Sequence, residues 1–279
     1  MTQQPFKIAE ETFVIPSYNP VPGVGLLYMN ALVIRGREPI LVDTGATIHS
    51  DAYIEAAFSL VDPVDVRWIF LSHEDRDHAG SLMRVLDMCP NARLVTNADA
   101  HGKLSEEWVI PPQRVYYANS GESFDAGDRV LTALRPPLFD SPATRGLWDP
   151  TTEVFYSSDS FGTIVAEEYE LGNDVPAPDF EWGFNWFNRV NHVWHELADP
   201  AKVAALAQKV RELHPKLLIS AHAPVAYDRV DELCDMIARI PTLPPQPLPT
   251  QLDLEAMLAG ERQPSEKAQP SEEPQPTAG

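Results

Sequence analysis

Short apolar runs alternate with longer amphipathic runs along the first 240 residues of the chain. The apolar runs are rich in β-branched and aromatic residues, which predicts strands, whereas the amphipathic runs repeat their apolar positions at helical spacing. Strands are expected at residues 25–36, 38–45, 66–72, 93–96, 114–119, 123–134, 154–158 and 216–222. Helices are expected at residues 49–61, 80–89, 184–199, 200–214 and 227–240. Since strands accumulate in both halves and helices follow them, we expect an α/β fold with two sheets face to face and helices outside.

The composition of the chain changes at Pro241. The segment 241–279 contains nine of the 27 prolines and no aromatic residue, so it cannot bury enough apolar surface to offset its ordering entropy. We therefore predict one domain over residues 1–240 and a disordered, Pro-rich acidic tail over residues 241–279. Within the tail, LDLEAMLAGE (252–261) fits either a short amphipathic helix that contacts a partner or a solvated linker.

The net charge of −20 at pH 7 argues against nucleic acid and anionic membrane surfaces as partners, because both are negatively charged themselves. No stretch reaches the roughly 18 apolar residues of a membrane span, and the N-terminus lacks the succession of a signal peptide. The two cysteines, Cys89 and Cys234, lie in apolar stretches and are expected to be reduced thiols. We expect a cytoplasmic protein.

The densest group of ionisable side chains directly follows the apolar run 66–70. The segment LSHEDRDHAGSL (71–82) places His73, Glu74, Asp75, Asp77 and His78 within six positions. Burying so many ionisable groups is costly unless a cation compensates their charge. An extended segment would direct His73 and Asp75 to one site, and Asp77 and His78 to a second. An exposed charged loop with a helix N-cap would explain one or two acids but not both histidines.

The segment resembles the H-x-[H/E/D]-x-D-H signature of the metallo-β-lactamase superfamily. LVDTG (41–45) resembles the strand and Asp-containing turn that precede this signature. VFYSSDSFG (154–162) resembles the strand that ends in a metal-bridging Asp, and LLISAHAPV (217–225) resembles the strand that delivers the final His. The elements occur in family order. The resemblance implies a four-layer αββα sandwich of the metallo-β-lactamase type with a dinuclear metal centre.

Within the superfamily, the chain is most similar to the diiron core of flavodiiron proteins. Their signature has a carboxylate where the hydrolases usually have His; Asp75 supplies it here, although that family normally uses the longer Glu. An oxygen-rich ligand set suits iron or manganese better than zinc. The resemblance implies two divalent metal ions, with iron favoured and zinc or manganese as alternatives. It assigns the bridge to Asp159 and catalytic roles to Asp77 and His78. The implied metal ligands are His73, Asp75, Asp77, His78, Asp140, Asp159 and His222.

Two departures from the family pattern concern a ligand and a domain. The family has another His between the signature and the bridging Asp, but residues 102–191 contain none. Asp140 in LFDSP is the nearest replacement donor, with Asp149 behind it, so the first metal site is expected to be carboxylate-rich, weakened or empty. After His222 only one helix and the tail are expected, which leaves no room for a flavodoxin domain, so we expect no flavin in this chain.

The resemblance implies a protein that binds or reduces dioxygen or nitric oxide with electrons from a separate donor protein. A homodimer is compatible with this interpretation. One alternative is a metal-dependent hydrolase of an ester, lactone or phosphoester, a small-molecule substrate class. A second is a degenerate, non-catalytic member that binds a ligand or partner. His192 and His195 are expected on one face of the helix at 184–199, where they would either line the pocket or be ordinary partly buried residues.

Overall fold

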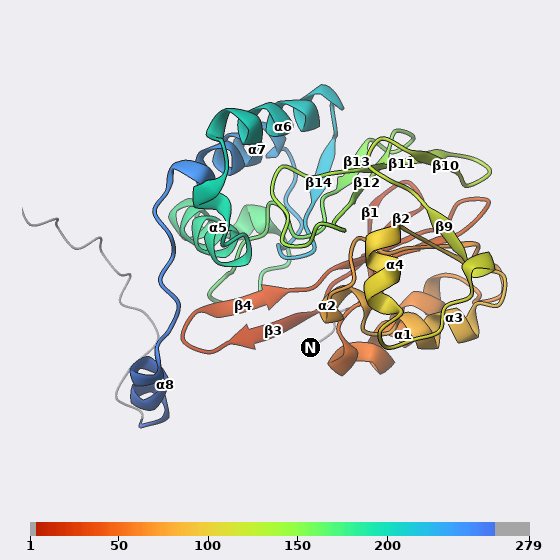
Figure 1. Cartoon of the computed structure of the whole chain (residues 1–279), viewed down its shortest axis with the longest axis horizontal. Coiled ribbons are helices and arrows are strands. Elements are labelled where there is room, and N and C mark those ends of the chain that lie inside the picture. Colours follow the sequence, from red (N-terminus) through yellow and green to blue (C-terminus); the bar gives the residue numbers. More distant parts are fainter. Residues whose placement is uncertain (1–3, 260–279) are drawn as a thin grey trace, which may run out of the picture.

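A sheet of seven strands forms one half of the protein in a computed structural model that describes residues 4–259 (Figure 1). Its strand order is β1-β2-β5-β6-β7-β8-β9, and β6 to β9 run parallel to one another. The strands are β1 (Phe6–Ala9), β2 (Thr12–Ile15), β5 (Ala31–Ile34), β6 (Ile40–Val42), β7 (Trp68–Phe70), β8 (Arg93–Thr96) and β9 (Val115–Tyr117). All residues of β5 and β6 are buried, as expected for central strands that are covered on both faces.

A second sheet of five strands faces the first. Its order is β10-β11-β12-β13-β14, and only its last pair, β13 and β14, is parallel. The strands are β10 (Ser123–Asp125), β11 (Val130–Leu134), β12 (Gly146–Asp149), β13 (Val154–Tyr156) and β14 (Leu217–Ile219). A separate hairpin of β3 (Tyr18–Val21) and β4 (Gly25–Tyr28) extends from the body (Figure 1).

Helices cover the outer face of each sheet. The first group is α1 (Ser50–Leu60), α2 (Arg76–Ala79), α3 (Leu82–Met88) and α4 (Ala98–Leu104). The second group is α5 (Ala177–Asn191), α6 (Pro200–Glu212) and α7 (Val230–Arg239). Short 3-10 turns connect several elements: η1 (Thr47–His49), η2 (Pro112–Arg114), η3 (Gly172–Asp174), η4 (His195–Leu197) and η5 (Ile240–Thr242).

Three layers of buried apolar side chains hold these elements together. Between the sheets, Leu32 and Phe70 of the first sheet share a cluster with Leu147 and Tyr156 of the second. A second cluster joins the first sheet to α1, α3 and α4, and a third joins the second sheet to α5, α6 and α7. The predicted four-layer αββα sandwich is therefore confirmed, because each sheet is apolar on both faces and needs a cover on each.

The helix predicted at 184–199 differs from the structure. α5 begins at Ala177 and ends at Asn191, and His195 lies in the separate turn η4. The expectation that one helix face carries His192 and His195 is therefore wrong. His192 instead takes up φ −109° and ψ 63°, which ends the helix just before it.

Part of the predicted tail lies within the described residues. Helix α8 (Gln251–Leu258) begins with a capping box between Thr250 and Asp253, and its Met257 side chain approaches Gly23 in the β3–β4 hairpin. Residues 260–279 lie outside the described residues, so the domain boundary and the disorder of the tail stay predictions. No helix between residues 4 and 259 is both long and apolar enough to cross a membrane.

We predict that truncation after Pro249 leaves the melting temperature within about 2 °C of the full chain. The reason is that Leu252 and Leu258 of α8 are 75% and 79% exposed, so little apolar burial is lost. Thermal unfolding of both forms is the measurement, with the fully buried Phe155→Ala as a control that costs about 3–5 kcal/mol. A drop as large as that of the control would contradict the prediction.

Candidate metal centre

Four loops meet where parallel strands end. The turn after β6 carries Asp43, and the segment 71–82, which includes helix α2, follows β7. The loop after β13 carries Asp159, and the loop after β14 carries His222. The carboxyl ends of parallel strands lie at the same edge of a sheet, which brings these side chains together from positions far apart in the sequence.

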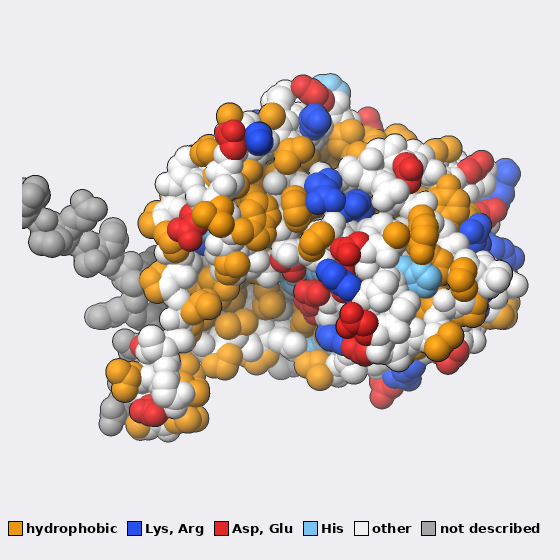
Figure 2. Space-filling view, in the orientation of Figure 1, with side chains coloured by type: hydrophobic (Ala, Val, Ile, Leu, Met, Phe, Trp, Pro, Cys, Tyr) orange, Lys and Arg blue, Asp and Glu red, His pale blue; other side chains and the backbone are white. Residues whose placement is uncertain are grey.

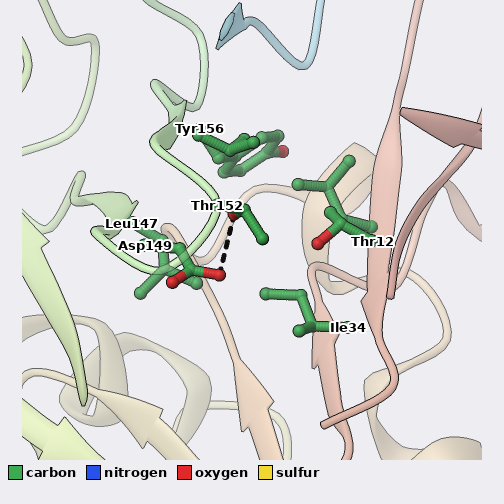
Figure 3. A pocket seen from close by; sticks show the side chains of 8 residues that line it. Thr12, Ile34, Leu147, Asp149, Thr152 and Tyr156 are labelled. Carbon is green, nitrogen blue, oxygen red and sulfur yellow. Dashed lines mark hydrogen bonds between the residues drawn. The ribbon is translucent and has the colours of Figure 1, made fainter. Parts of the chain in front are cut away.

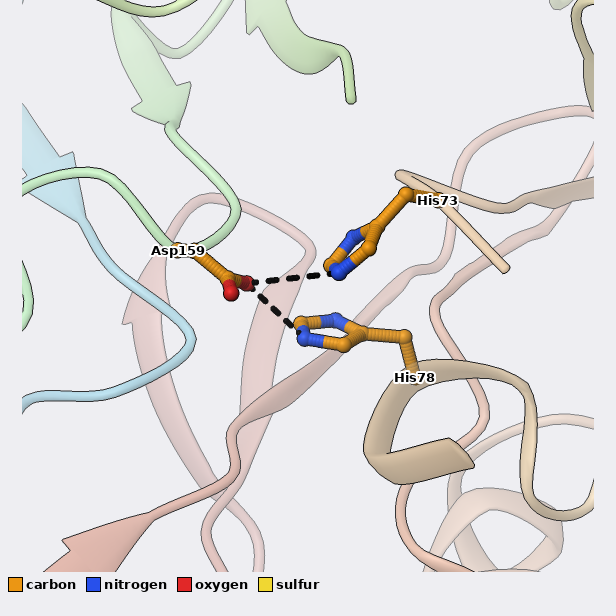
Figure 4. Close-up of side chains that lie close together, drawn as sticks. All are labelled: His73, His78 and Asp159. Carbon is orange, nitrogen blue, oxygen red and sulfur yellow. Dashed lines mark ion pairs between the residues drawn. The ribbon is translucent and has the colours of Figure 1, made fainter. Parts of the chain in front are cut away.

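The central group is the carboxylate of Asp159, which is 3% exposed. Its Oδ1 lies 2.9 Å from Nε2 of His78, 3.2 Å from Nε2 of His222 and 3.8 Å from Nε2 of His73. Figure 4 shows His73 and His78 directed at this carboxylate. Its other oxygen, Oδ2, accepts a hydrogen bond from the Asn191 side chain at 2.9 Å. One oxygen of Asp159 is therefore held toward all three imidazoles.

Hydrogen bonds at Nδ1 fix the direction of two of these imidazoles. His78 Nδ1 lies 2.8 Å from Asp43 Oδ2, and His222 Nδ1 lies 2.6 Å from the carbonyl oxygen of Tyr28. Since a carbonyl only accepts, Nδ1 of His222 carries a hydrogen, so Nε2 is the ring atom that could bind a metal once its own proton has left. Metal-binding histidines are oriented in this way in many proteins.

The structure brings all seven predicted metal ligands together. Three sets of donor atoms lie within 4.8 Å of one another. The sets are His73, Asp75 and Asp140; His73, His78 and Asp159; and Asp77, His78 and His222. Asp140 lies beside His73, with its Oδ2 3.6 Å from His73 Nε2, and its replacement of the missing His stays a prediction. Nε2 of His73 and of His78 are buried and have no hydrogen-bond partner among residues 4–259, which fits nitrogen atoms that would hold a cation.

The charges of the cluster alter the pKa of its members in opposite directions. Burial and the neighbouring His78 charge lower the pKa of His73, but Asp159, Asp140 and Asp75 outweigh them and raise it to about 10. Burial also lowers the pKa of His78, yet Asp77, Asp159 and Asp43 raise it well above its usual range. Burial raises the pKa of Asp159, whereas the three imidazoles lower it well below its usual range. The carboxylates thus retain positive charge at the centre of the site.

Asp149, the second candidate after Asp140 to replace the missing His, lies outside the candidate metal centre. It forms a buried ion pair of 2.8 Å with Arg129 and accepts a hydrogen bond from Thr152. Figure 3 shows it in a small pocket between the two sheets, which Thr12 and Tyr156 also line. In none of the donor sets found among residues 4–259 does Asp149 take part, so its proposed reserve role is wrong.

Asp43 is a site residue whose role the sequence reasoning missed. It is 1% exposed, and its carboxylate accepts hydrogen bonds from the Ser72 backbone and hydroxyl and from Tyr156. These contacts leave it oriented toward His78 Nδ1. The LVDTG phrase that contains Asp43 resembles a family motif, from which a positioning role could have been predicted.

The site opens to solvent beside Asp75 and Asp77, whose side chains are 51% and 31% exposed. Figure 2 shows acidic side chains gathered near the middle of this face, next to a broad area of hydrophobic side chains. Glu74 belongs to none of the donor sets; its carboxylate pairs with Lys103 and accepts a hydrogen bond from the Ser141 hydroxyl. It therefore anchors the loop that carries the donors.

The chain matches proteins of one family over most of its length. The family profile described as ODP family beta lactamase matches residues 27–223. A nitric oxide reductase of Moorella thermoacetica is 24% identical over 148 residues, which cover 53% of this chain and 37% of that protein. Two further curated relatives match over 51% and 35% of their own length, so the chain spans about half or less of the proteins it resembles.

Solved structures share the fold. The flavodiiron protein from Giardia intestinalis has a TM-score of 0.75 at 15% identity and covers 86% of this chain and 59% of that chain. The rubredoxin oxygen:oxidoreductase from Desulfovibrio gigas has a TM-score of 0.69 at 18% identity, over 86% of this chain and 61% of that chain. These matches confirm the predicted resemblance to the fold of flavodiiron cores.

We predict different metal losses for two single substitutions. Asp159→Ala should lose both metals, because its Oδ1 faces the imidazoles of both outer donor sets, whereas Asp140→Ala should lose only the metal beside His73. The measurement is elemental analysis of each purified variant, with the exposed Asp87→Ala as control. Two metals retained in Asp159→Ala would contradict the shared role of this carboxylate.

Metal binding should release protons at neutral pH. Because the pKa values of His73, His78 and His222 are raised, these groups hold protons in the metal-free protein. Their protonation contributes its whole share of the free energy of unfolding below the unfolded pKa of about 6.5. This share is lost as the pH rises through the raised pKa values of the folded state, about 10 for His73.

Metal must displace these protons, so affinity should rise with pH in this window and about two to three protons should leave per pair of metals. Calorimetric titration with zinc at pH 7 in buffers of different ionisation enthalpy measures this number. The absence of any net proton release would contradict it.

Proposed function

Because the chain belongs to the ODP family of the beta-lactamase fold, we propose that its seven clustered donors hold two iron ions that reduce dioxygen or nitric oxide. Electrons would come from a donor outside this domain. The observation that carries the proposal is the overlap of three donor sets around one buried carboxylate, Asp159. Such an overlap supports two neighbouring metal positions that share a ligand.

We assign the first metal to His73, Asp75 and Asp140, and the second to Asp77, His78 and His222. Asp159 would serve both, through the oxygen that faces all three imidazoles. Its Oδ2 accepts a hydrogen bond from Asn191, which would hold the carboxylate in place for this role. The four carboxylates carry a total charge of −4. Two divalent cations would balance this charge if the imidazoles are neutral.

The balance of ligand types favours redox chemistry over hydrolysis. The first position has one imidazole and three carboxylates if Asp159 is included, and carboxylates favour the oxidised state of iron and weaken Lewis acidity toward a carbonyl. Two bound irons would supply electrons to a diatomic molecule, and the Moorella relative is named a nitric oxide reductase. We therefore favour the reduction of a diatomic gas over hydrolysis as the reaction of this site.

The protein's own contribution would be to hold the donors rigidly and to keep the inner side of the pocket dry. Asp43 and the Tyr28 carbonyl fix two imidazoles, and Asn191 fixes Asp159. Phe187 packs against His222 with ring centroids 5.1 Å apart. Phe187 can pack this closely because Gly162 has no side chain. A Cβ atom at position 162 would lie 2.3 Å from Phe187 Cε1. An aromatic side chain that excludes water on one side of the donors favours a small apolar gas as the substrate.

The partners follow from this chemistry. The substrate would be a diatomic gas, and the electron donor would reach the centre from outside the domain described here. A homodimer stays a prediction, since the structure contains one chain. Asp77 and His78, expected to be catalytic, would act as ligands of the second metal.

The test compares the reaction with oxygen to hydrolysis. Protein loaded anaerobically with iron and reduced with dithionite, from which excess reductant is removed, should consume oxygen faster than it hydrolyses generic esters, lactones or phosphodiesters. An oxygen electrode and a parallel chromogenic screen provide the two rates. Asp159→Ala, treated in the same way, is the control and should consume no oxygen beyond the buffer.

Two results would contradict the proposal. Saturable hydrolysis by a zinc-loaded protein, together with iron-loaded protein that ignores both oxygen and nitric oxide, would make the chain a hydrolase. Less than about a tenth of a metal equivalent after anaerobic reconstitution would leave a non-catalytic binding protein, because a dinuclear centre needs two cations.

A further inference from the structure

The Nδ1 atom of His73 has a different environment from the Nδ1 atoms of the other two imidazoles of the centre. One of those faces a carboxylate and the other a backbone carbonyl, and both of these groups only accept hydrogen bonds. His73 instead faces two hydroxyl groups, Ser72 Oγ and Ser158 Oγ, each 3.2 Å from its Nδ1. A hydroxyl can donate or accept, so neither serine alone decides which ring nitrogen of His73 carries a hydrogen.

These two serines form a hydroxyl chain, Ser158 followed by Ser72, that ends at Asp43. Ser158 Oγ donates a hydrogen bond to Ser72 Oγ at 3.0 Å, and Ser72 Oγ donates one to Asp43 Oδ2 at 2.7 Å. The same Oδ2 lies 2.8 Å from Nδ1 of His78. An unbroken series of hydrogen-bond contacts therefore connects His73 with His78, which we assign to different metal positions.

Asp43 sets the direction of each hydrogen in this series. An ionised carboxylate only accepts, so the hydrogen of the Ser72 hydroxyl points at Asp43 and the Ser72 oxygen has only lone pairs left. The Ser158 hydroxyl points its own hydrogen at that oxygen. Nδ1 of His73 thus meets only lone pairs and carries a hydrogen itself. Nε2, which faces Asp159, is then the ring atom of His73 that could bind a metal once its own proton has left.

The backbone of Ser158 is held in a conformation that places its hydroxyl beside His73. Its φ is 56°, in the left-handed region that glycine adopts more easily than any other residue. The side chain is 0% exposed, and its oxygen also lies 3.4 Å from Asp159 Oδ1, a longer contact than those with Ser72 and His73. A serine retained where glycine would be less strained supports a role for the hydroxyl itself.

We propose that the hydroxyl chain extends the orienting effect of Asp43 from His78 to His73. One carboxylate that belongs to none of the donor sets then fixes an imidazole at each metal position. Ser158 and Ser72 are positioning residues for the first metal, because they act through His73. The inference rests on the dinuclear centre proposed above and not on its reaction with a gas.

The first test substitutes glycine for Ser158 in the full chain. Glycine adopts a φ of 56° without strain, so Ser158→Gly removes the hydroxyl and still favours the observed turn. Competition with a chelator should show that one of the two zinc ions binds about 10- to 100-fold more weakly, while the other keeps its affinity within about threefold. Ser72→Ala breaks the hydroxyl chain one step further from Asp159 and should weaken the same zinc ion.

The weakened zinc ion should be the one at the first metal position. In the Asp140→Ala background, which should keep only the second metal, Ser158→Gly should leave the remaining zinc affinity unchanged. Two unchanged affinities in the single variant would overturn the proposal. A loss that persists in the Asp140→Ala background would also overturn it, because the effect would then not act through His73.

A matched control lies next to Ser158. Ser157 is also 0% exposed, but its hydroxyl bonds to the backbone carbonyl oxygens of Ser160 and Ile219. Ser157→Ala should leave both zinc affinities unchanged even if it lowers the melting temperature. A loss of zinc affinity equal to that of Ser158→Gly would show that loosening this loop is sufficient, and would overturn the positioning role.

A measurement on the unmodified protein covers the case in which the variants do not fold. The ¹⁵N-histidine spectra of zinc-loaded protein should show a hydrogen on Nδ1 of His73 and zinc on its Nε2. Zinc on Nδ1 of His73, in protein that binds two zinc ions, would overturn the inference while leaving the metal centre intact. Failure to bind zinc at all would instead overturn the centre itself.

Discussion

The structure depends on one buried carboxylate that faces three imidazoles. Asp159 Oδ1 lies within 3.8 Å of Nε2 of His73, His78 and His222, in a place where an isolated charge would be very unfavourable. Compensation comes from the histidines themselves when they are protonated, or from cations when they are not. The loops after β7, β13 and β14 can therefore hold their observed positions only if positive charge stays at the centre.

The surrounding elements are arranged to keep these donors in place. Asp43, with φ of 56°, ends its strand in a left-handed turn that directs its carboxylate to His78, and Ser158 precedes Asp159 in the same unusual conformation. Non-glycine residues tolerate this conformation only where packing enforces it, and such strain often marks functional sites. The sheets supply that packing, because the Tyr156 hydroxyl reaches Asp43 from the inter-sheet core.

Much of this arrangement could be predicted from the sequence. The two donor directions from segment 73–78 are as expected, but alternation in an extended segment is not their cause, because Asp77 and His78 lie in helix α2. Asp140, the nearest candidate for the missing histidine, lies beside His73. The end of α5 was not predictable, because the amphipathic pattern continues past Asn191 while His192 takes up non-helical dihedral angles. The position of His192 depends on that end. Asp149 was misplaced because proximity in sequence does not show that Arg129 pairs with it.

The central claim is that two metals share Asp159. The most direct measurement is anomalous X-ray diffraction at the iron edge from crystals of iron-loaded protein. Two peaks about 3.5–4 Å apart, both adjacent to Asp159 Oδ1 and one of them between His73 and Asp140, are the predicted result. A single peak away from Asp159, or two peaks that do not share this carboxylate, would contradict the account.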